Sequence, residues 1–405
     1  MRILIIGSVW VEPKSSAAGS RMLQLINAFK GKDWDVHFAC GASFSENAID
    51  LTSVGVKTHA ITLNSSTFNA FVGDLQPDVV VFDRFMTEEQ YAWRVAECCP
   101  NALRVLNTED LHCLRNAREE AVKNESDWQE IIKDSDMAKR EVAAIFRSDL
   151  TLMISTFEMQ LLQDMFHVPN SQLHYCPFIL ENLPSNSAEF DSRTDFVFIG
   201  NFKHKPNADA VLVLKKQIWP TLRKLQPSAK LHIYGAYAEQ KHLQLTNKNE
   251  SFLVHGKAES VKEVFENARV LLAPLRFGAG LKGKLVEAMQ YACPSVTTSI
   301  GAEGIGNEVD WPGYVSNSFS DFTEKANELY ANKMRWTECS EKSECLLKAN
   351  FMTENYTATL VKIIVNAKKD MLEQRKQNFV GSMLLHHSMQ STKYLSRFIE
   401  EKNKK

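Results

Sequence analysis

The sequence predicts an α/β protein built from two doubly wound parallel sheets that follow one another along the chain. Short apolar strands alternate with segments of helical period, and this pattern is typical of parallel sheets covered by helices on both faces. A polar, proline-bounded stretch over Pro184–Glu189 interrupts the alternation near the middle of the chain. The length of 405 residues agrees with two domains.

The first half of the chain contains the first of the two expected sheets. Its first strand is predicted at Ile3–Ile6, and a helix with one apolar face follows over Ser20–Phe29. Helices are also expected over Glu88–Cys98 and, as one long helix, from Arg115 to Phe146. The remaining strands of this half are predicted at Asp35–Cys40, Val56–Leu63, Asp78–Phe82, Leu103–Leu106 and Leu150–Ile154.

The second half repeats the pattern after the polar stretch. A strand is predicted at Phe196–Gly200, a helix from about Asn207 to Leu225, and mainly helical structure from Asp321 through Leu360–Arg375 to a polar tail. Further strands are predicted at Leu231–Tyr234, Phe252–Val254, Val270–Ala273 and Ser295–Thr298. We therefore expect an N-terminal domain over 1–183, a linker over 184–194, a second domain over 195–353, and C-terminal helices with a polar tail over 354–405.

Composition argues against several classes of protein. The formal net charge is −2, and no basic run interleaves with aromatic residues, so nucleic acid is not an expected partner. None of the eight cysteines forms a C-x-x-C pair, which indicates a reducing, cytoplasmic compartment rather than disulfides or a zinc site. No segment approaches the ~18 apolar residues of a membrane span, although peripheral contact with a membrane is compatible with the sequence.

The segment Ala273–Met289 carries the clearest chemical signal. A predicted strand leads into a turn that contains three glycines and Lys282, and a helix is expected to begin at about Lys284. Glycines allow a ligand to approach the backbone closely, and the N-terminus of a helix presents N–H groups with a partial positive charge. The segment therefore predicts a phosphate site, in preference to a tight turn with solvated lysines.

Two short motifs also match this turn. Gly278–Gly283 fits the dinucleotide-binding motif G-x-G-x-x-G, and Glu303 lies where a ribose-binding acid could fall. This match leaves an NAD(P)-dependent oxidoreductase or epimerase as an alternative. Three residues separate Pro274 from Gly278, however, whereas the first glycine of that fingerprint normally ends the strand. Gly278–Lys284 fits a P-loop, but Leu285 stands where a serine or threonine must hold Mg²⁺.

A wider resemblance covers residues 195–305. This region resembles the C-terminal domain of family-4 (group 1) retaining glycosyltransferases of the GT-B fold, in which two Rossmann-like domains face each other across a cleft. The resemblance implies transfer of a sugar from a nucleotide-sugar donor to an acceptor hydroxyl, with retention and without a metal or further cofactor. The matching pieces are Phe198–Phe202, Pro206–Val211, His232–Gly235, His255–Gly256, Leu272–Leu275 with the glycine-lysine turn, Glu287–Met289 and Pro294–Thr298.

The resemblance also implies roles for individual residues. Glu287 matches a glutamate that accepts hydrogen bonds from the donor ribose. Lys282 would act in catalysis by stabilising the charge that develops on the leaving diphosphate. The other implied donor-binding residues are Gly280, Leu281 and Lys284 around the diphosphate, and Gly200, Asn201 and Gly235 along the floor of the cleft.

The first half resembles the family more loosely. Gly19 lies where the family has a glycine-containing loop near the transferred sugar, although an ordinary turn with Ser20 as helix cap explains the same residues. His112 follows a predicted strand where many members carry a histidine near the donor, and a purely structural histidine is the alternative. Asp83 and Arg84 also end a strand at the expected cleft, without an assigned role.

The sequence departs from the family pattern at three positions. Ala279 stands where a second glutamate is common, and Asn201 and Asn207 replace an arginine and a lysine. The missing glutamate puts the sugar contacts in doubt and leaves a non-catalytic nucleotide-sugar-binding protein as a second alternative. The acceptor stays open among a saccharide, a lipid-linked glycan and a protein.

Overall fold

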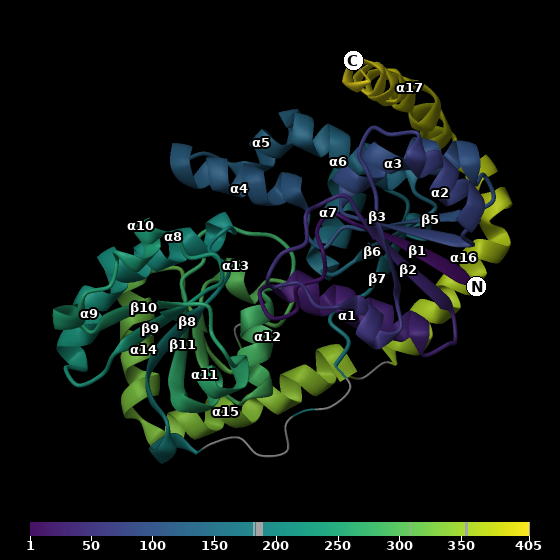
Figure 1. Ribbon diagram of the computed structural model, residues 1–405. Helices are drawn as coiled ribbons and strands as arrows, with labels where there is room; N and C mark the ends of the chain where they lie inside the picture. The colour runs from purple at the N-terminus through teal and green to yellow at the C-terminus, as the bar shows by residue number, and fades with distance from the viewer. Residues whose placement is uncertain (181–182, 184–188, 308, 353–354, 405) are drawn as a thin grey trace.

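The computed structural model describes residues 1–180, 183, 189–307, 309–352 and 355–404. Two parallel sheets with flanking helices lie side by side, the first formed by the N-terminal half and the second by the C-terminal half (Figure 1). Residues 184–188 of the predicted linker lie outside the described residues. The domain boundaries expected from the sequence stay predictions.

The N-terminal sheet has seven parallel strands in the order β3-β2-β1-β4-β5-β6-β7. Its strands are β1 (Arg2–Gly7), β2 (Asp35–Cys40), β3 (Lys57–Ala60), β4 (Val79–Asp83), β5 (Leu103–Asn107), β6 (Leu150–Met153) and β7 (Leu173–Tyr175). The predicted strand over Val56–Leu63 is shorter than expected. Strand β7 was not predicted, because three residues at a sheet edge are too few to show a period.

The C-terminal sheet has six parallel strands in the order β10-β9-β8-β11-β12-β13. Its strands are β8 (Thr194–Ile199), β9 (Leu231–Tyr234), β10 (Phe252–Gly256), β11 (Ala268–Ala273), β12 (Ser295–Thr297) and β13 (Gly313–Val315). In both sheets the strand order reverses beside the first strand, which creates a crevice at the carboxyl ends of the strands. The edge strand β13 was also missed.

The predicted long helix over Arg115–Phe146 is wrong. The chain forms three helices there, α4 (His112–Asn124), α5 (Trp128–Asp134) and α6 (Asp136–Arg147). Glu125 ends α4 in the left-handed conformation, and the side chains of Asp127 and Ser135 cap the next two helices. The other helices of this half are α1 (Ala17–Lys30), α2 (Thr67–Leu75), α3 (Phe85–Cys98) and α7 (Thr156–Phe166).

The helix predicted over Asn207–Leu225 is divided into α8 (Lys205–Val213), a π-helical segment (Leu214–Ile218) and α9 (Trp219–Leu225). The further helices of the C-terminal half are α10 (Gln240–Leu243), α11 (Val261–Asn267), α12 (Gly283–Gln290), α13 (Ser299–Ala302), α14 (Phe319–Ala331) and α15 (Lys333–Leu347).

The chain returns to the N-terminal half after α15. Helix α16 (Tyr356–Gln377) packs against α1, and α17 (Phe379–Asn403) packs against α3 and α6. Asn378 caps α17, and this helix continues through the polar residues near the C-terminal end to Asn403. Among the described residues, no helix is both long and apolar enough to cross a membrane.

Apolar side chains fill both faces of each sheet. In β1, Leu4 and Ile6 point to the face that α3 and α4 cover, whereas Ile3 and Ile5 point to the face that α1 and α16 cover. This alternation follows from the period of two residues in a strand. The strand ends that the buried sheets hold in place form the walls of the cleft described next.

Candidate active site

A cleft of about 630 Å³ lies between the two halves of the molecule. The N-terminal half contributes residues that follow β1, β4 and β5, and the C-terminal half contributes residues that follow β8, β9 and β11. Ligands of open α/β sheets bind at these carboxyl ends. Predicted site residues that line the cleft are His112, Gly200, Asn201, Gly235, Gly280, Leu281, Lys282, Lys284 and Glu287.

Two glycines bring the backbone close together at the floor of the cleft. A Cβ atom on Gly235 would lie 2.2 Å from the carbonyl oxygen of Gly200, and one on Gly200 would lie 2.7 Å from Nζ of Lys284. Neither position accommodates a larger residue without movement of its neighbours. The chain segments that follow β8 and β9 therefore approach each other closely beside Lys284.

Lys284 and Glu287 lie one turn apart on α12 and both face the cleft. The Lys284 ammonium lies 4.3 Å from the centre of the Phe198 ring and donates to Oδ1 of Asn207. Burial lowers the pKa of Lys284 to about 7 and raises the pKa of Glu287 to about 7. Within the described residues the Glu287 carboxylate accepts no hydrogen bond, so it is available to a ligand.

The glycine-lysine turn is docked on the N-terminal half. Gly280 has φ of 61°, and its N–H donates to Oε1 of Glu158 at 2.8 Å. This amide is therefore already occupied in the structure, unlike the free phosphate donor that the resemblance implied. Ala279 is buried within the apolar core of the N-terminal half.

Arg118 and Lys282 hold this turn in place. Arg118 donates to the carbonyl oxygen of Gly278 at 2.9 Å and forms two bonds to Glu303, at 2.8 and 2.7 Å. The Lys282 ammonium donates to the carbonyl oxygen of Gly280 at 2.8 Å, and burial lowers its pKa to about 8. Because Glu303 is committed to Arg118, it is not free to bind a ribose as the dinucleotide alternative required.

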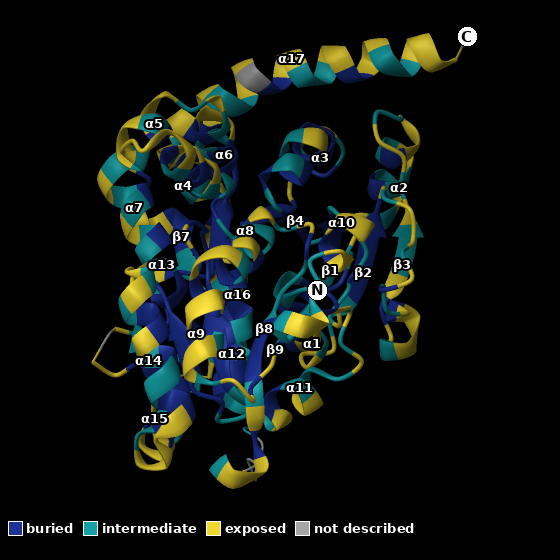
Figure 2. Cartoon of the chain, turned by 90° about the vertical axis from the view of Figure 1, so that its left-hand side faces the viewer, coloured by how far each residue is buried: buried dark blue, intermediate teal, exposed yellow. Residues whose placement is uncertain are grey.

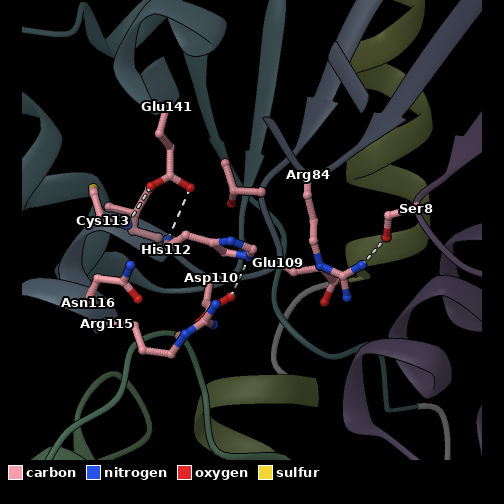
Figure 3. A network of polar contacts seen from close by, with 12 residues as sticks. Ser8, Arg84, Glu109, Asp110, His112, Cys113, Arg115, Asn116 and Glu141 are labelled. Carbon is pink, nitrogen blue, oxygen red and sulfur yellow. Dashed lines mark hydrogen bonds and ion pairs between the residues drawn. The ribbon is translucent and has the colours of Figure 1, made fainter. Parts of the chain in front are cut away.

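The N-terminal wall carries a network of charged side chains (Figure 3). Asp110 forms an ion pair with Arg115, and its Oδ1 lies 3.5 Å from Nε2 of His112. Burial opposes ionisation of Asp110, but the charges of Arg115, His112 and His204 hold its pKa below the usual value. Sequence reasoning missed Asp110 and His204, because neither belongs to a recognisable motif.

His112 occupies the first position of α4, where Glu141 accepts hydrogen bonds from its backbone N–H and from that of Cys113. Burial lowers the pKa of His112 to about 4, so the imidazole is neutral at pH 7. Its ring meets Phe85 edge-on at 5.6 Å. The backbone and the aromatic contact together fix the ring at the wall of the cleft.

Arg84 and Gly19 differ in their relation to the cleft. Arg84, at the end of β4, lines it with φ of 71° and forms an ion pair with Asp83 at 3.1 Å. Gly19 does not line it but lies inside α1, which begins after Ser16 rather than at Ser20. A Cβ on Gly19 would lie 2.2 Å from the Glu12 carbonyl oxygen, so the glycine is required for packing.

Residues 193–332 match the family model of the glycosyl transferases of group 1. These residues therefore form a group 1 glycosyl transferase region, and the chain is a glycosyltransferase. Group 1 glycosyltransferases use nucleotide-sugar donors. No curated protein matches the chain in sequence, and neither the oxidoreductase nor the epimerase alternative finds support in the comparisons.

Solved structures show that this glycosyltransferase has the GT-B fold. Sucrose-phosphate synthase from Thermosynechococcus elongatus is similar with a TM-score of 0.68 and 14% identity, over 90% of this chain and 98% of that one. A glycosyltransferase from Rickettsia africae gives a TM-score of 0.64 and 11% identity, over 91% and 99%. Anabaena HepE with UDP-glucose gives 0.62 and 10%, over 92% and 100%.

Among the described residues, no group of three His, Cys, Asp or Glu side chains is placed to hold a metal ion. Cationic groups that line the cleft from the C-terminal half include Lys284 on α12, Lys203 in the loop after β8 and Lys205 at the start of α8. The arrangement thus offers ammonium groups and a helix N-terminus to an anion, and a carboxylate to hydroxyl groups.

Proposed function

We propose that the glycosyltransferase binds a uridine diphosphate sugar in this cleft, with the nucleotide on the C-terminal half, and transfers the sugar with retention. The observation that carries the proposal is the pair Lys284 and Glu287, one turn apart on α12 and both facing the cleft. Two of the similar structures, Anabaena HepE and TarM, were solved with UDP or UDP-glucose, which supports uridine as the base.

Glu287 is proposed to accept hydrogen bonds from the two ribose hydroxyls. Helical side chains lean toward the N-terminus of their helix, which directs this carboxylate toward the turn before α12. Its raised pKa arises from burial without a hydrogen-bond donor. Donation by ribose hydroxyls would favour the ionised form and lower that pKa again.

The diphosphate is proposed to bind between Lys284 and the first turn of α12. A helix N-terminus stabilises anions through its unpaired N–H groups, and the backbone of Leu281 and the turn that follows lines the cleft there. Lys284 adds a full charge on the floor side, next to Gly200 and Asn201. Lys282, held behind the turn, adds a second charge that stabilises the leaving diphosphate.

We infer that Asp110 replaces the carboxylate that the family pattern expects at Ala279. A Cβ on Gly280 would lie 2.8 Å from Cβ of Asp110, so this carboxylate enters the cleft beside Ala279, from the opposite half. Neutral His112 lies 3.5 Å from it and is proposed to contact the transferred sugar. The acceptor hydroxyl would then approach from the N-terminal half.

Retention can be measured directly. Following the anomeric configuration of the first-formed product by NMR should show the configuration of the donor, because the acceptor is expected to attack from the face that the diphosphate leaves. Transfer to water in the absence of an acceptor provides a reference product of the same sugar. An inverted first product would contradict the proposed mechanism but leave the donor site intact.

A further inference from the structure

The last helix, α17, presents large apolar side chains to solvent. Phe379 is 75% exposed, Tyr394 62% and Phe398 65%. At 100° per residue, the exposed apolar residues of α17 fall on one side of the helix. We call this side the apolar face of α17; its residues are Phe379, Val380, Met383, Tyr394, Leu395 and Phe398.

The opposite side of α17 packs on the N-terminal half and carries small, polar and apolar residues. A Cβ on Gly381 would lie 2.1 Å from the carbonyl oxygen of Phe146, and Oγ of Ser396 accepts from Nη2 of Arg94 at 2.9 Å. Met389 is buried on the same side. A surface helix normally turns its apolar stripe toward the core, whereas α17 also leaves six large apolar side chains exposed.

The apolar face is also long and lies at the edge of the molecule. Phe379 and Phe398 are about 29 Å apart along the axis at ~1.5 Å per residue. Figure 2 shows α17 along one margin of the molecule, with exposed residues recurring along its length. Single exposed apolar residues are ordinary, but three large ones gathered near each end of the same side of one helix mark a site of interaction.

The net charge of the C-terminal helices indicates what kind of partner binds the apolar face of α17. Residues 356–405 contain ten Lys and Arg against four Asp and Glu, whereas the whole chain contains 47 against 49. Lys362 and Lys369 on α16, and Arg397 and Lys402 on α17, are exposed. The excess of positive charge is therefore concentrated in the two helices at the C-terminal end, which an anionic surface would attract.

We propose that the apolar face of α17 docks on an anionic lipid membrane. An interfacial helix lies in the plane of the membrane, with aromatic and aliphatic side chains in the lipid and Lys or Arg near the headgroups. A second copy of the chain fits less well, because a symmetric contact would place the net positive charge of both α17 helices in one interface. Such placement favours a lipid-linked glycan among the acceptors left open by the sequence.

Sedimentation of the full-length protein with vesicles tests this proposal. We expect the protein to bind vesicles of equal parts phosphatidylcholine and phosphatidylserine, and to bind phosphatidylcholine vesicles much more weakly. Combining Phe379→Ser, Leu395→Ser and Phe398→Ser should reduce binding to the anionic vesicles at least about tenfold, because burial of the three side chains in lipid is lost. Arg397→Glu with Lys402→Glu should also weaken binding, more at low salt than at high salt.

A matched control replaces three exposed apolar residues of the C-terminal half, Leu225, Val309 and Met334, with serine. This control and Glu287→Gln should bind vesicles like the wild type, which separates the proposal from the donor site. Unchanged thermal unfolding of each variant shows that the fold is kept.

The proposal is overturned if the wild type stays in solution with both kinds of vesicle, or if the α17 variant binds vesicles as well as the wild type. Light scattering gives a further outcome that would overturn the proposal. If the wild type has the mass of two chains, the α17 variant has the mass of one, and neither binds vesicles, the apolar face belongs to a contact with a second copy.

Discussion

Lys284 and Glu287 both have a pKa of about 7, although an ordinary lysine and an ordinary glutamate lie far to either side of that value. Burial causes both shifts, because it disfavours the charged form of each group. A diphosphate in contact with Lys284 would favour its protonated form, and ribose hydroxyls in contact with Glu287 would favour its ionised form. Binding should therefore add a proton to one residue and remove a proton from the other.

The opposite proton changes at Lys284 and Glu287 predict the pH dependence of donor binding. In the wild type the two proton changes nearly cancel, so affinity for a UDP-sugar should vary little between pH 6 and pH 8, about one unit on either side of the two pKa values. Lys284→Ala leaves only proton release by Glu287, so its affinity should rise with pH. Glu287→Gln leaves only proton uptake by Lys284, so its affinity should fall as pH rises.

Titration calorimetry in two buffers of different ionisation enthalpy measures these proton changes. Lys284→Ala should also bind about ten- to a hundredfold more weakly, since a lost charge-assisted hydrogen bond costs about 1.5–3 kcal/mol. Lys262→Ala, on the exposed side of α11, is the matched control and should behave like the wild type. Proton changes of the same sign in Lys284→Ala and Glu287→Gln would show that at least one of these residues does not contact the donor.

The residue contacts of the site were only partly predictable. Glu287 and the two lysines follow from a local motif, and the cleft includes them. The bond between Glu158 and the Gly280 N–H joins residues 122 positions apart, and no local pattern indicates it. Asp110 and His204 enter the cleft for the same reason, because the tertiary fold alone brings β5 and α8 to one cleft.

At the scale of elements, the ends of β8 and β9 determine the shape of the cleft floor. Gly235→Ala should lower the free energy of unfolding by about 1–3 kcal/mol, because its Cβ would lie 2.2 Å from the Gly200 carbonyl oxygen. Gly73→Ala is the control: it lies in α2 with no atom near the added Cβ, and the change should leave stability unchanged or raise it slightly. Chemical denaturation measures both, and equal stability of the two variants would contradict the close approach of these strand ends.

Strands were easier to predict than helix boundaries. Asp35–Cys40 and Leu231–Tyr234 have the predicted bounds, since buried parallel strands are continuous apolar runs between turns. The breaks between α4, α5 and α6 contain neither proline nor glycine. Caps such as Asp127 and Ser135 compete with helix continuation only through a side-chain hydrogen bond, and the same residues also occur inside helices.

For the whole molecule, the main feature is that both halves build one site. Arg118 of the N-terminal half binds Gly278 and Glu303 of the C-terminal half, and Tyr237 donates to Glu12 at 2.7 Å across the cleft. Ala279, a residue of the C-terminal half, packs in the apolar core of the N-terminal half. A pattern of strands and helices predicts two such halves, but it does not predict which side chains of one insert into the other.

The measurement that tests the central claim most directly is titration calorimetry of the whole protein with UDP and with its 2′,3′-dideoxy analogue. The wild type should bind UDP about ten- to a hundredfold more tightly than the analogue, since about 1.5–3 kcal/mol of charge-assisted hydrogen bonding to Glu287 is lost. Glu287→Gln should fold normally, bind UDP correspondingly more weakly, and lose most of this discrimination, while Glu263→Gln on α11 should retain it. If Glu287→Gln and the wild type are equally sensitive to removal of the ribose hydroxyls, Glu287 does not bind the ribose and the donor site lies elsewhere.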